Sequence, residues 1–231
     1  MNQPKLSRRQ LKKKIIEALE KADFSEALQD LRALPLSTTI NGLLGTLLHP
    51  QPEVRWLGIT ACGILIGDLA RIDMESARRS IRRQLWNLTE ESGGCAIGAP
   101  ELIAEALAND ENLAREFSPS FTSHIMPEGN YLDFIPLQTG VVWGLGRLAK
   151  TYPEFLKSSV SYLEPLLESE DKAIRGMSAY AIGLIQPDFN SSQLEAIVKD
   201  ESKIQIFLNL KLTEISIHDL CLQPTPELKV N

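Results

Sequence analysis

The strongest constraint on the fold is an internal repeat. Pro52–Leu65 reads PEVRWLGITACGIL and Lys172–Ile185 reads KAIRGMSAYAIGLI, so that Gly63 corresponds to Gly183. The two glycines lie 120 positions apart, and steps of 40 positions reach two further apolar segments, CAIGAPELIAEAL and IPLQTGVVWGLGRLA. Both segments have apolar residues at helical spacing. The sequence therefore predicts four related helices, one in each of four consecutive units.

Each of these helices is preceded, about ten residues earlier, by another apolar stretch with helical spacing. These stretches are Leu43–Leu48, Ile81–Leu88, Phe121–Met126 and Tyr162–Leu167. One helix pair cannot bury its apolar side alone, whereas stacked pairs share a continuous core. Close approach of neighbouring helices is expected at small residues, namely Gly63, Gly144, Gly146 and Gly183. The pattern predicts one continuous solenoid of helix pairs.

Helix starts can be placed from prolines and capping residues. Proline is tolerated in the first turn of a helix, where its missing N–H is not needed. The prolines at such positions are Pro52, Pro100, Pro136 and Pro153. Asp171 and Ser191 are expected to cap the helices that follow them. Ser7–Leu34 reads as two amphipathic helices separated near Asp23.

The end of the chain departs from the helical pattern. Lys203–Leu212 alternates polar and apolar residues, which favours strands with a turn at Asn209. The same positions also fit a helix through Ile204, Phe207 and Leu208, so hairpin and helix both stay open over residues 203–217. A hairpin here would cover the last apolar face of the solenoid, which must not be left open.

A unit of about 40 residues with two helices is typical of HEAT repeats. The segments VRWLGITACGIL and AIRGMSAYAIGL resemble the second helices of such repeats. The stretches WNLTEESGGCAIGAPELIAEAL and PEGNYLDFIPLQTGVVWGLGRLAK are similar to an uncharacterised family of bacterial HEAT-like (armadillo-like) proteins. HEAT repeats keep an arginine in each unit, but the two central units here have Cys95 and Ile135 at that position.

The resemblance implies an all-α fold, a right-handed α–α superhelix of HEAT-like helix pairs, with a small C-terminal β-hairpin as an option. We expect an irregular N-terminal repeat or cap over residues 1–35 and about four helix pairs over residues 36–200. Residues 201–231 are expected to form a C-terminal cap and a tail.

Charge and composition narrow the classes of function. The chain has 24 Lys and Arg against 30 Asp and Glu, a net charge of -6, which argues against a dedicated nucleic-acid binder. Residues 1–83 hold 14 basic and 9 acidic residues, so the remainder is strongly acidic. No signal peptide and no transmembrane segment is recognisable. We expect a cytoplasmic protein that binds no membrane and whose three cysteines are reduced.

Two turns in the divergent central units are the candidate interaction surface. If repeats stack in order, these turns adjoin and bring together an acidic, partly aromatic set of side chains suited to a basic partner. The set comprises Trp86, Asn87, Glu90, Glu91, Ser92, Gly93, Gly94, Cys95, Glu128, Asn130, Tyr131 and Asp133. The alternative is simple helix capping, because glycines end helices and carboxylates favour helix N-termini.

Other reactive residues give no catalytic pattern. His49, His124 and His218 are isolated and lack metal-ligand spacing, so we expect no metal site and no cofactor. Cys95 could be a reactive thiol if exposed, but no histidine lies nearby in the sequence. The three tryptophans lie on apolar faces and are expected to pack in the core. They are Trp56, Trp86 and Trp143.

The favoured function is a non-enzymatic protein–protein interaction scaffold or adaptor of the HEAT type, monomeric, with a protein partner of unknown identity. One alternative is a HEAT-like alkylpurine DNA glycosylase, whose cleft needs basic and aromatic residues. The residues that suggest it are Arg78, Arg79, Arg82, Arg83 and Trp86. A chromophore lyase of the HEAT-like type is a further alternative, supported only by the repeat.

Overall fold

The computed structural model describes residues 7–89 and 96–222. Its elements, in order, are α1 (Arg8–Leu19), α2 (Phe24–Arg32), α3 (Leu36–Leu43), η1 (Leu44–Thr46), α4 (Pro52–Ile72), α5 (Met74–Thr89), α6 (Ala99–Ala108), α7 (Glu111–Thr122), η2 (Ser123–Ile125), α8 (Ile135–Ala149), η3 (Pro153–Ser159), α9 (Val160–Leu163), η4 (Pro165–Glu168), α10 (Lys172–Ile185), α11 (Ser192–Ile197), β1 (Lys203–Leu208), β2 (Lys211–Ser216) and α12 (Ile217–Leu222). The fold is all-α with a small β-hairpin, which confirms the predicted class.

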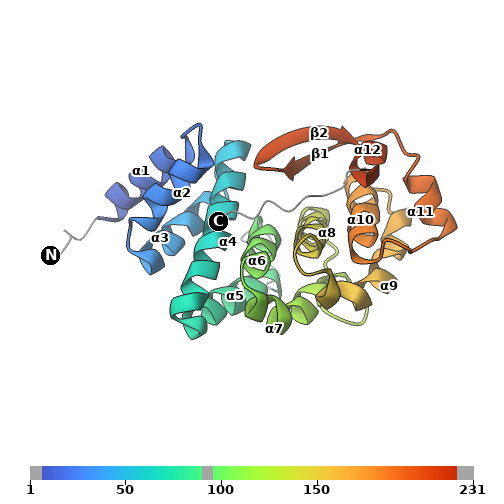
Figure 1. Ribbon diagram of the computed structural model, residues 1–231, viewed down its shortest axis with the longest axis horizontal. Helices are drawn as coiled ribbons and strands as arrows, with labels where there is room; N and C mark the ends of the chain where they lie inside the picture. The colour runs from blue at the N-terminus through green and yellow to red at the C-terminus, as the bar shows by residue number, and fades with distance from the viewer. Residues whose placement is uncertain (1–6, 90–95, 223–231) are drawn as a thin grey trace.

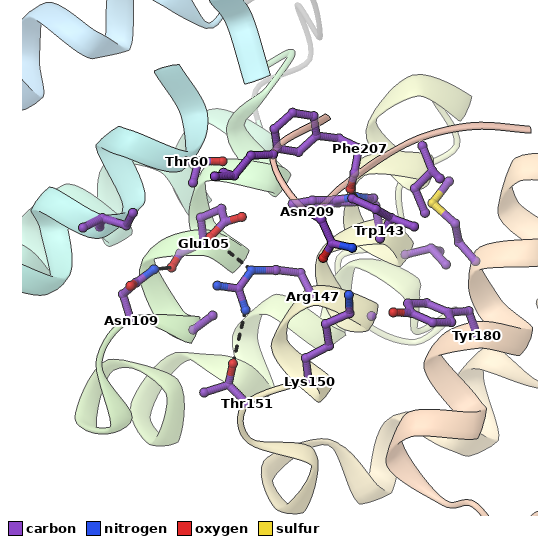
Figure 2. Close-up of a pocket in the computed structure, with 18 of the residues that line it drawn as sticks. Thr60, Glu105, Asn109, Trp143, Arg147, Lys150, Thr151, Tyr180, Phe207 and Asn209 are labelled. Atoms are coloured by element: carbon purple, nitrogen blue, oxygen red, sulfur yellow. Dashed lines mark hydrogen bonds and ion pairs between the residues drawn. The ribbon is translucent and has the colours of Figure 1, made fainter. Parts of the chain in front are cut away.

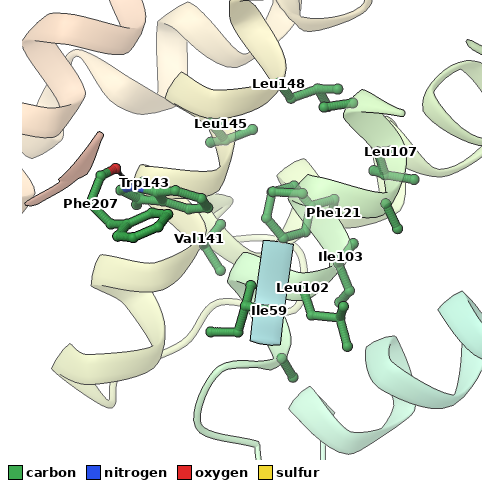
Figure 3. Packing of buried hydrophobic residues seen from close by; sticks show 14 of the residues in the cluster. Ile59, Leu102, Ile103, Leu107, Phe121, Val141, Trp143, Leu145, Leu148 and Phe207 are labelled. Atoms are coloured by element: carbon green, nitrogen blue, oxygen red, sulfur yellow. Dashed lines mark hydrogen bonds between the residues drawn. The ribbon is translucent and has the colours of Figure 1, made fainter. Parts of the chain in front are cut away.

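The helices form two rows. The second helix of each predicted unit belongs to an inner row, in which α4, α6, α8 and α10 pack one against the next (Figure 1). The outer row consists of α3, α5, α7 and the short segments from η3 to η4. Figure 3 shows the core between α6 and α8, where Leu102, Phe121 and Leu145 are fully buried. Stacking of neighbouring units therefore provides one continuous core.

The predicted helix starts are confirmed. Each of the four prolines lies at the first or second position of its helix. The side chain of Asp171 accepts hydrogen bonds from the backbone N–H groups of Ala173 and Ile174 at 2.8 and 3.0 Å. Ser191 accepts one from Leu194 at 3.2 Å. Asp23 separates α1 from α2 and caps α2.

Close helix approach is confirmed at some of the predicted glycines but not at all of them. A Cβ at Gly63 would lie 2.8 Å from the backbone carbon of Glu105, so α4 and α6 can pack this closely only with glycine there. A Cβ at Gly144 would lie 2.8 Å from the Cβ of Ala104. The prediction is wrong for Gly183, which has no atom within 4 Å of such a Cβ. Its position on the exposed side of α10 explains the difference.

These two glycines form a matched pair for a stability measurement. Gly63→Ala should lower the free energy of unfolding by about 2 kcal/mol or more, because the added methyl overlaps backbone that cannot move freely. Gly183→Ala should raise it by up to about 1 kcal/mol, because alanine favours the helix and meets open space. Urea unfolding followed by circular dichroism measures both. Equal effects of the two changes would contradict the close approach at Gly63.

The C-terminal segment is a hairpin, so the strand alternative is confirmed and the helix alternative is wrong. Ile204 pairs with Ile215 and Leu208 with Lys211, in antiparallel register. The turn residues Asn209 and Leu210 have φ of 49° and 63°, the combination that a two-residue hairpin turn requires. Ile204 and Ile206 are buried, as the alternation predicts.

The hairpin does more than cover the last helix. β1 packs on α10, the last helix of the inner row, whereas β2 reaches α4, the first one (Figure 1). The hairpin therefore crosses the inner row as a strap. In a HEAT-type solenoid the inner face is the usual open binding surface, and here part of it is covered.

Candidate functional site

A pocket of about 380 Å³ lies where the hairpin crosses the inner row. Its walls come from α4, α6, α8 and α10, and residues 206–210 of the hairpin close one side (Figure 2). The volume falls within the range of pockets that hold small organic ligands. Phe24 of α2 also lines the pocket. Because six elements that are distant in the sequence meet here, the pocket exists only in the folded solenoid.

An aromatic cluster fixes the hairpin over the pocket. The rings of Trp56 and Phe207 are stacked, with centroids 4.9 Å apart and planes at 6°. Trp56 also contacts Trp143, with centroids 4.8 Å apart. The indole Nε1–H of Trp143 donates a hydrogen bond of 3.1 Å to the carbonyl oxygen of Phe207. Trp143 and Phe207 thus join α8 to the strap and also line the pocket.

A buried ion pair forms the polar wall. The side chain of Glu105 is only 5% exposed, and its Oε2 lies 3.1 Å from Nε of Arg147. The Nη1 of Arg147 donates to Oγ1 of Thr151 at 3.2 Å (Figure 2). Asn109 donates from Nδ2 to the backbone carbonyl of Glu105 at 2.8 Å. These bonds hold the guanidinium of Arg147 at the pocket wall.

Lys150 is a second cation in the same wall. The pKa of Lys150 is lowered to about 8, mainly by burial and also by the charge of Arg147, while the charge of Glu105 acts in the opposite direction. The ammonium nitrogen lies 5.5 Å from the centre of the Tyr180 ring. Within residues 7–89 and 96–222, no carboxylate lies within ion-pair distance of Lys150. The lysine is therefore partly desolvated without a paired anion.

Two further residues of the pocket are in unfavourable states. The Oγ1 of Thr60 is buried and has no hydrogen-bond partner among the described residues. Leu210 occupies the left-handed region, where a residue with a Cβ is strained and glycine would not be. Both residues line the pocket. Such local penalties gather at sites that bind ligands more often than at purely structural ones.

The described members of the predicted interaction surface lie mostly at the protein surface. Trp86 is 63% exposed, so its predicted core packing is wrong, while Trp56 and Trp143 do pack against the core. Asn87 donates to Gln84 at 3.3 Å. The tryptophan lies near the end of α5, whose buried residues are on the opposite side of the helix.

The second predicted turn is held by specific hydrogen bonds. Glu128 accepts one from the hydroxyl of Tyr162 at 2.7 Å, which lowers the pKa of Glu128. Asn130 donates from Nδ2 to Ser123 at 2.9 Å. Tyr131 is 38% exposed, and Asp133 is exposed as well. This part of the predicted surface is accessible to a partner.

The first predicted turn falls outside the described residues. It comprises Glu90, Glu91, Ser92, Gly93, Gly94 and Cys95. The expected proximity of the two turns, and the choice between interaction surface and helix caps, therefore stay predictions.

Two of the four arginines in the cluster on α5, Arg78 and Arg82, are engaged in ion pairs. Nε of Arg78 lies 2.7 Å from Oε2 of Glu116, and Nη1 of Arg82 lies 2.8 Å from Oε1 of Glu75. These residues belong to α5 and α7, two helices of the outer row, and do not line the pocket. The paired arginines weaken the case for a cleft that binds DNA.

Sequence reasoning did not select the pocket residues. Glu105 is the residue that could have been noticed, since it is a carboxylate in the middle of a helix whose other residues, apart from Glu101 in the first turn, are all apolar. Charged residues are rarely fully buried unless they are paired, so such a residue predicts a buried cation nearby. Its partner Arg147 lies 42 positions later, one repeat further along the chain.

Comparison with known proteins agrees with the fold. Residues 135–185, which span α8 to α10, match the family model of the HEAT-like repeat. This match confirms the resemblance to HEAT-repeat proteins predicted from the 40-residue period.

Two individual proteins are similar over most of the chain. An uncharacterised protein of Archaeoglobus fulgidus is 24% identical over 182 residues, covering 78% of this chain and 92% of the relative. The crystal structure of an engineered protein superposes with a TM-score of 0.44 at 16% identity, covering 76% of this chain and 78% of that one.

Within the described part of the chain, no helix combines the length and apolarity needed to cross a bilayer.

Proposed function

We propose that this protein is a non-enzymatic binding protein of the HEAT-like type, which holds a small organic ligand in the pocket beneath the hairpin. The observation that carries the proposal is the strap from α10 to α4, which converts part of the inner face into a chamber of about 380 Å³. The chamber combines aromatic walls with a few placed polar groups, the usual make-up of a small-molecule site.

The unfavourable residues around the chamber support the same proposal. Stability alone would favour glycine at Leu210 and an apolar residue at Lys150, because strain and desolvation would then be relieved. Binding proteins keep such residues where they contact a ligand, and sacrifice some stability for it. Both residues face the same pocket.

A neutral fluorescent probe tests whether the chamber binds ligands. N-phenyl-1-naphthylamine should bind with enhanced emission, and Ala108→Phe should weaken its binding by at least about tenfold, because Ala108 lines the pocket and a larger side chain fills it. Ala33→Phe is the control, since Ala33 is exposed at the end of α2. Equal binding by both variants would reject the chamber as the site.

A protein partner is the second candidate function, and an exposed aromatic side chain favours it. Trp86 is 63% exposed, and aromatic residues of this kind often anchor interfaces. Trp86→Ala should abolish capture of a partner that the wild-type protein retains in pull-down with mass spectrometry. Ile72→Ala is the matched control, since Ile72 is an exposed apolar residue on α4. Loss of the partner in both variants, or in neither, would argue against this surface.

A further inference from the structure

We propose that the ligand of the pocket is an amphiphilic organic anion. Its carboxylate, sulfonate or phosphate head would contact Lys150 and Arg147, and its aromatic or branched apolar body would pack against Trp143 and Phe207. This inference rests on the proposed function and adds the chemical class of the ligand.

The charge balance favours an anion. Among the residues that line the pocket, Lys150 and Arg147 are basic and Glu105 is the acidic one. The carboxylate of Glu105 is already paired with Arg147 at 3.1 Å. One positive charge is therefore left in a partly desolvated wall, where an anionic group would be held more strongly than in water.

The guanidinium of Arg147 can contribute to the same head group. Its Nε is engaged by Glu105 and its Nη1 by Thr151. A guanidinium carries five N–H donors, so donors on Nη2 stay available for an oxygen of the ligand. Arg147 lies in the last turn of α8, and Lys150, three residues later, is the C-cap of that helix (Figure 2). Donors from these two side chains at the end of α8 can thus converge on one anionic head.

The apolar part of the pocket wall suits an apolar body. The ring of Phe207 and the indole of Trp143 line the pocket together with Val142, Met177 and Ile206. Phe207 is held in place by stacking on Trp56, so the aromatic wall is preformed. A flat or branched hydrocarbon group would bury its surface here, while its charged end lies at Lys150.

Two related probes separate the anionic head from the apolar body. 1-Anilinonaphthalene-8-sulfonate carries a sulfonate, whereas N-phenyl-1-naphthylamine has a similar ring system without charge. The wild-type protein should bind the sulfonate more tightly than the neutral probe at pH 7. Lys150→Gln should weaken binding of the sulfonate by at least about tenfold and binding of the neutral probe by less than about twofold. Lys157→Gln is the control, because Lys157 is exposed and does not line the pocket.

The pH dependence gives an independent readout. The ionisable groups facing Lys150 are Glu105 of α6, Arg147 of α8 and Tyr180 of α10. Since the pKa of Lys150 is about 8, the free protein loses the ammonium charge above that pH. Raising the pH from 7 to 9.5 should weaken binding of the sulfonate by at least about tenfold in the wild type. In Lys150→Gln the same change of pH should weaken it by much less.

The outcomes distinguish the two proposals. If neither probe binds to the wild-type protein, the proposed function fails, and the inference on the ligand class fails with it. If the neutral probe binds but the sulfonate binds no better, the pocket is a binding site and the anionic class is wrong. The inference is supported if Lys150→Gln loses affinity for the sulfonate but not for the neutral probe, and unfolds as cooperatively as the wild type.

Discussion

Lys150→Met should raise the free energy of unfolding at pH 7 by about 2–3 kcal/mol and at the same time remove the preference for an anionic probe. The reason is that burial lowers the pKa of Lys150 from 10.5 to about 8 in the folded protein. Folding must therefore place an ammonium group in an environment that disfavours its charge. Methionine fills a similar volume without that penalty.

The sign of the pH dependence follows from the lowered pKa. Below pH 8 the lysine is charged in both states, and the penalty on folding is complete. Between pH 8 and 10.5 the folded protein has released the proton and the unfolded chain has not, so the penalty decreases as the pH rises. The increase in the free energy of unfolding caused by Lys150→Met should therefore fall to about 1 kcal/mol at pH 9.5.

Urea unfolding at pH 7 and pH 9.5 measures this difference. Lys157→Met serves as the control, since Lys157 is exposed and its replacement should change stability by less than about 0.5 kcal/mol. Two results would contradict the unpaired state of Lys150. One is a Lys150→Met protein that is less stable than the wild type, and the other is a gain in its free energy of unfolding that grows as the pH rises.

Phe207→Ala should have the largest effect among substitutions in the hairpin, a loss of about 3–4 kcal/mol. The ring is 4% exposed, stacks on Trp56 and lies over the pocket. Its removal leaves a cavity and detaches the strap from α4. Both fluorescent probes should lose affinity by more than about tenfold, because the pocket then loses one of the two rings of its aromatic wall.

A gentler substitution keeps this test informative if Phe207→Ala unfolds the hairpin. Phe207→Leu retains most of the buried apolar area but not the ring stack, and should cost about 1–1.5 kcal/mol. Phe189→Ala is the control, since Phe189 is partly buried in the loop after α10 and does not line the pocket. Unchanged affinity for both probes in Phe207→Ala would show that the ring of Phe207 takes no part in ligand binding.

Local patterns explain why much of the fold could be predicted. The prolines in first turns and the cap at Asp171 depend on residues close together in the sequence, and the 40-residue period is visible by comparing sequence segments with each other. The structure confirms all three. The alternation from Lys203 to Leu212 also predicted strands correctly. The prediction of close packing at Gly183 was wrong, because periodicity alone does not distinguish the inner side of a helix from its exposed side.

The pocket could not be predicted because it depends on long-range placement. Phe207 meets Trp56 across the whole inner row, and no local pattern indicates that the hairpin reaches back to α4. Lys150 looked like an ordinary basic residue at the end of a helix, a position that normally faces solvent. Trp86 illustrates the converse, since it was expected in the core although it lies on the side of α5 opposite the buried residues and is exposed.

The most direct test of the account is the pKa of Lys150 with and without an anionic ligand. Lysines labelled by reductive ¹³C-methylation can be titrated by NMR, and Lys150→Gln assigns the signal of interest. We predict a pKa near 8 for Lys150 in the free protein and a clear increase when 1-anilinonaphthalene-8-sulfonate is bound, because a nearby anion stabilises the ammonium form. A signal that titrates near 10.5 in the free protein, or that does not respond to the sulfonate, would contradict the anionic pocket.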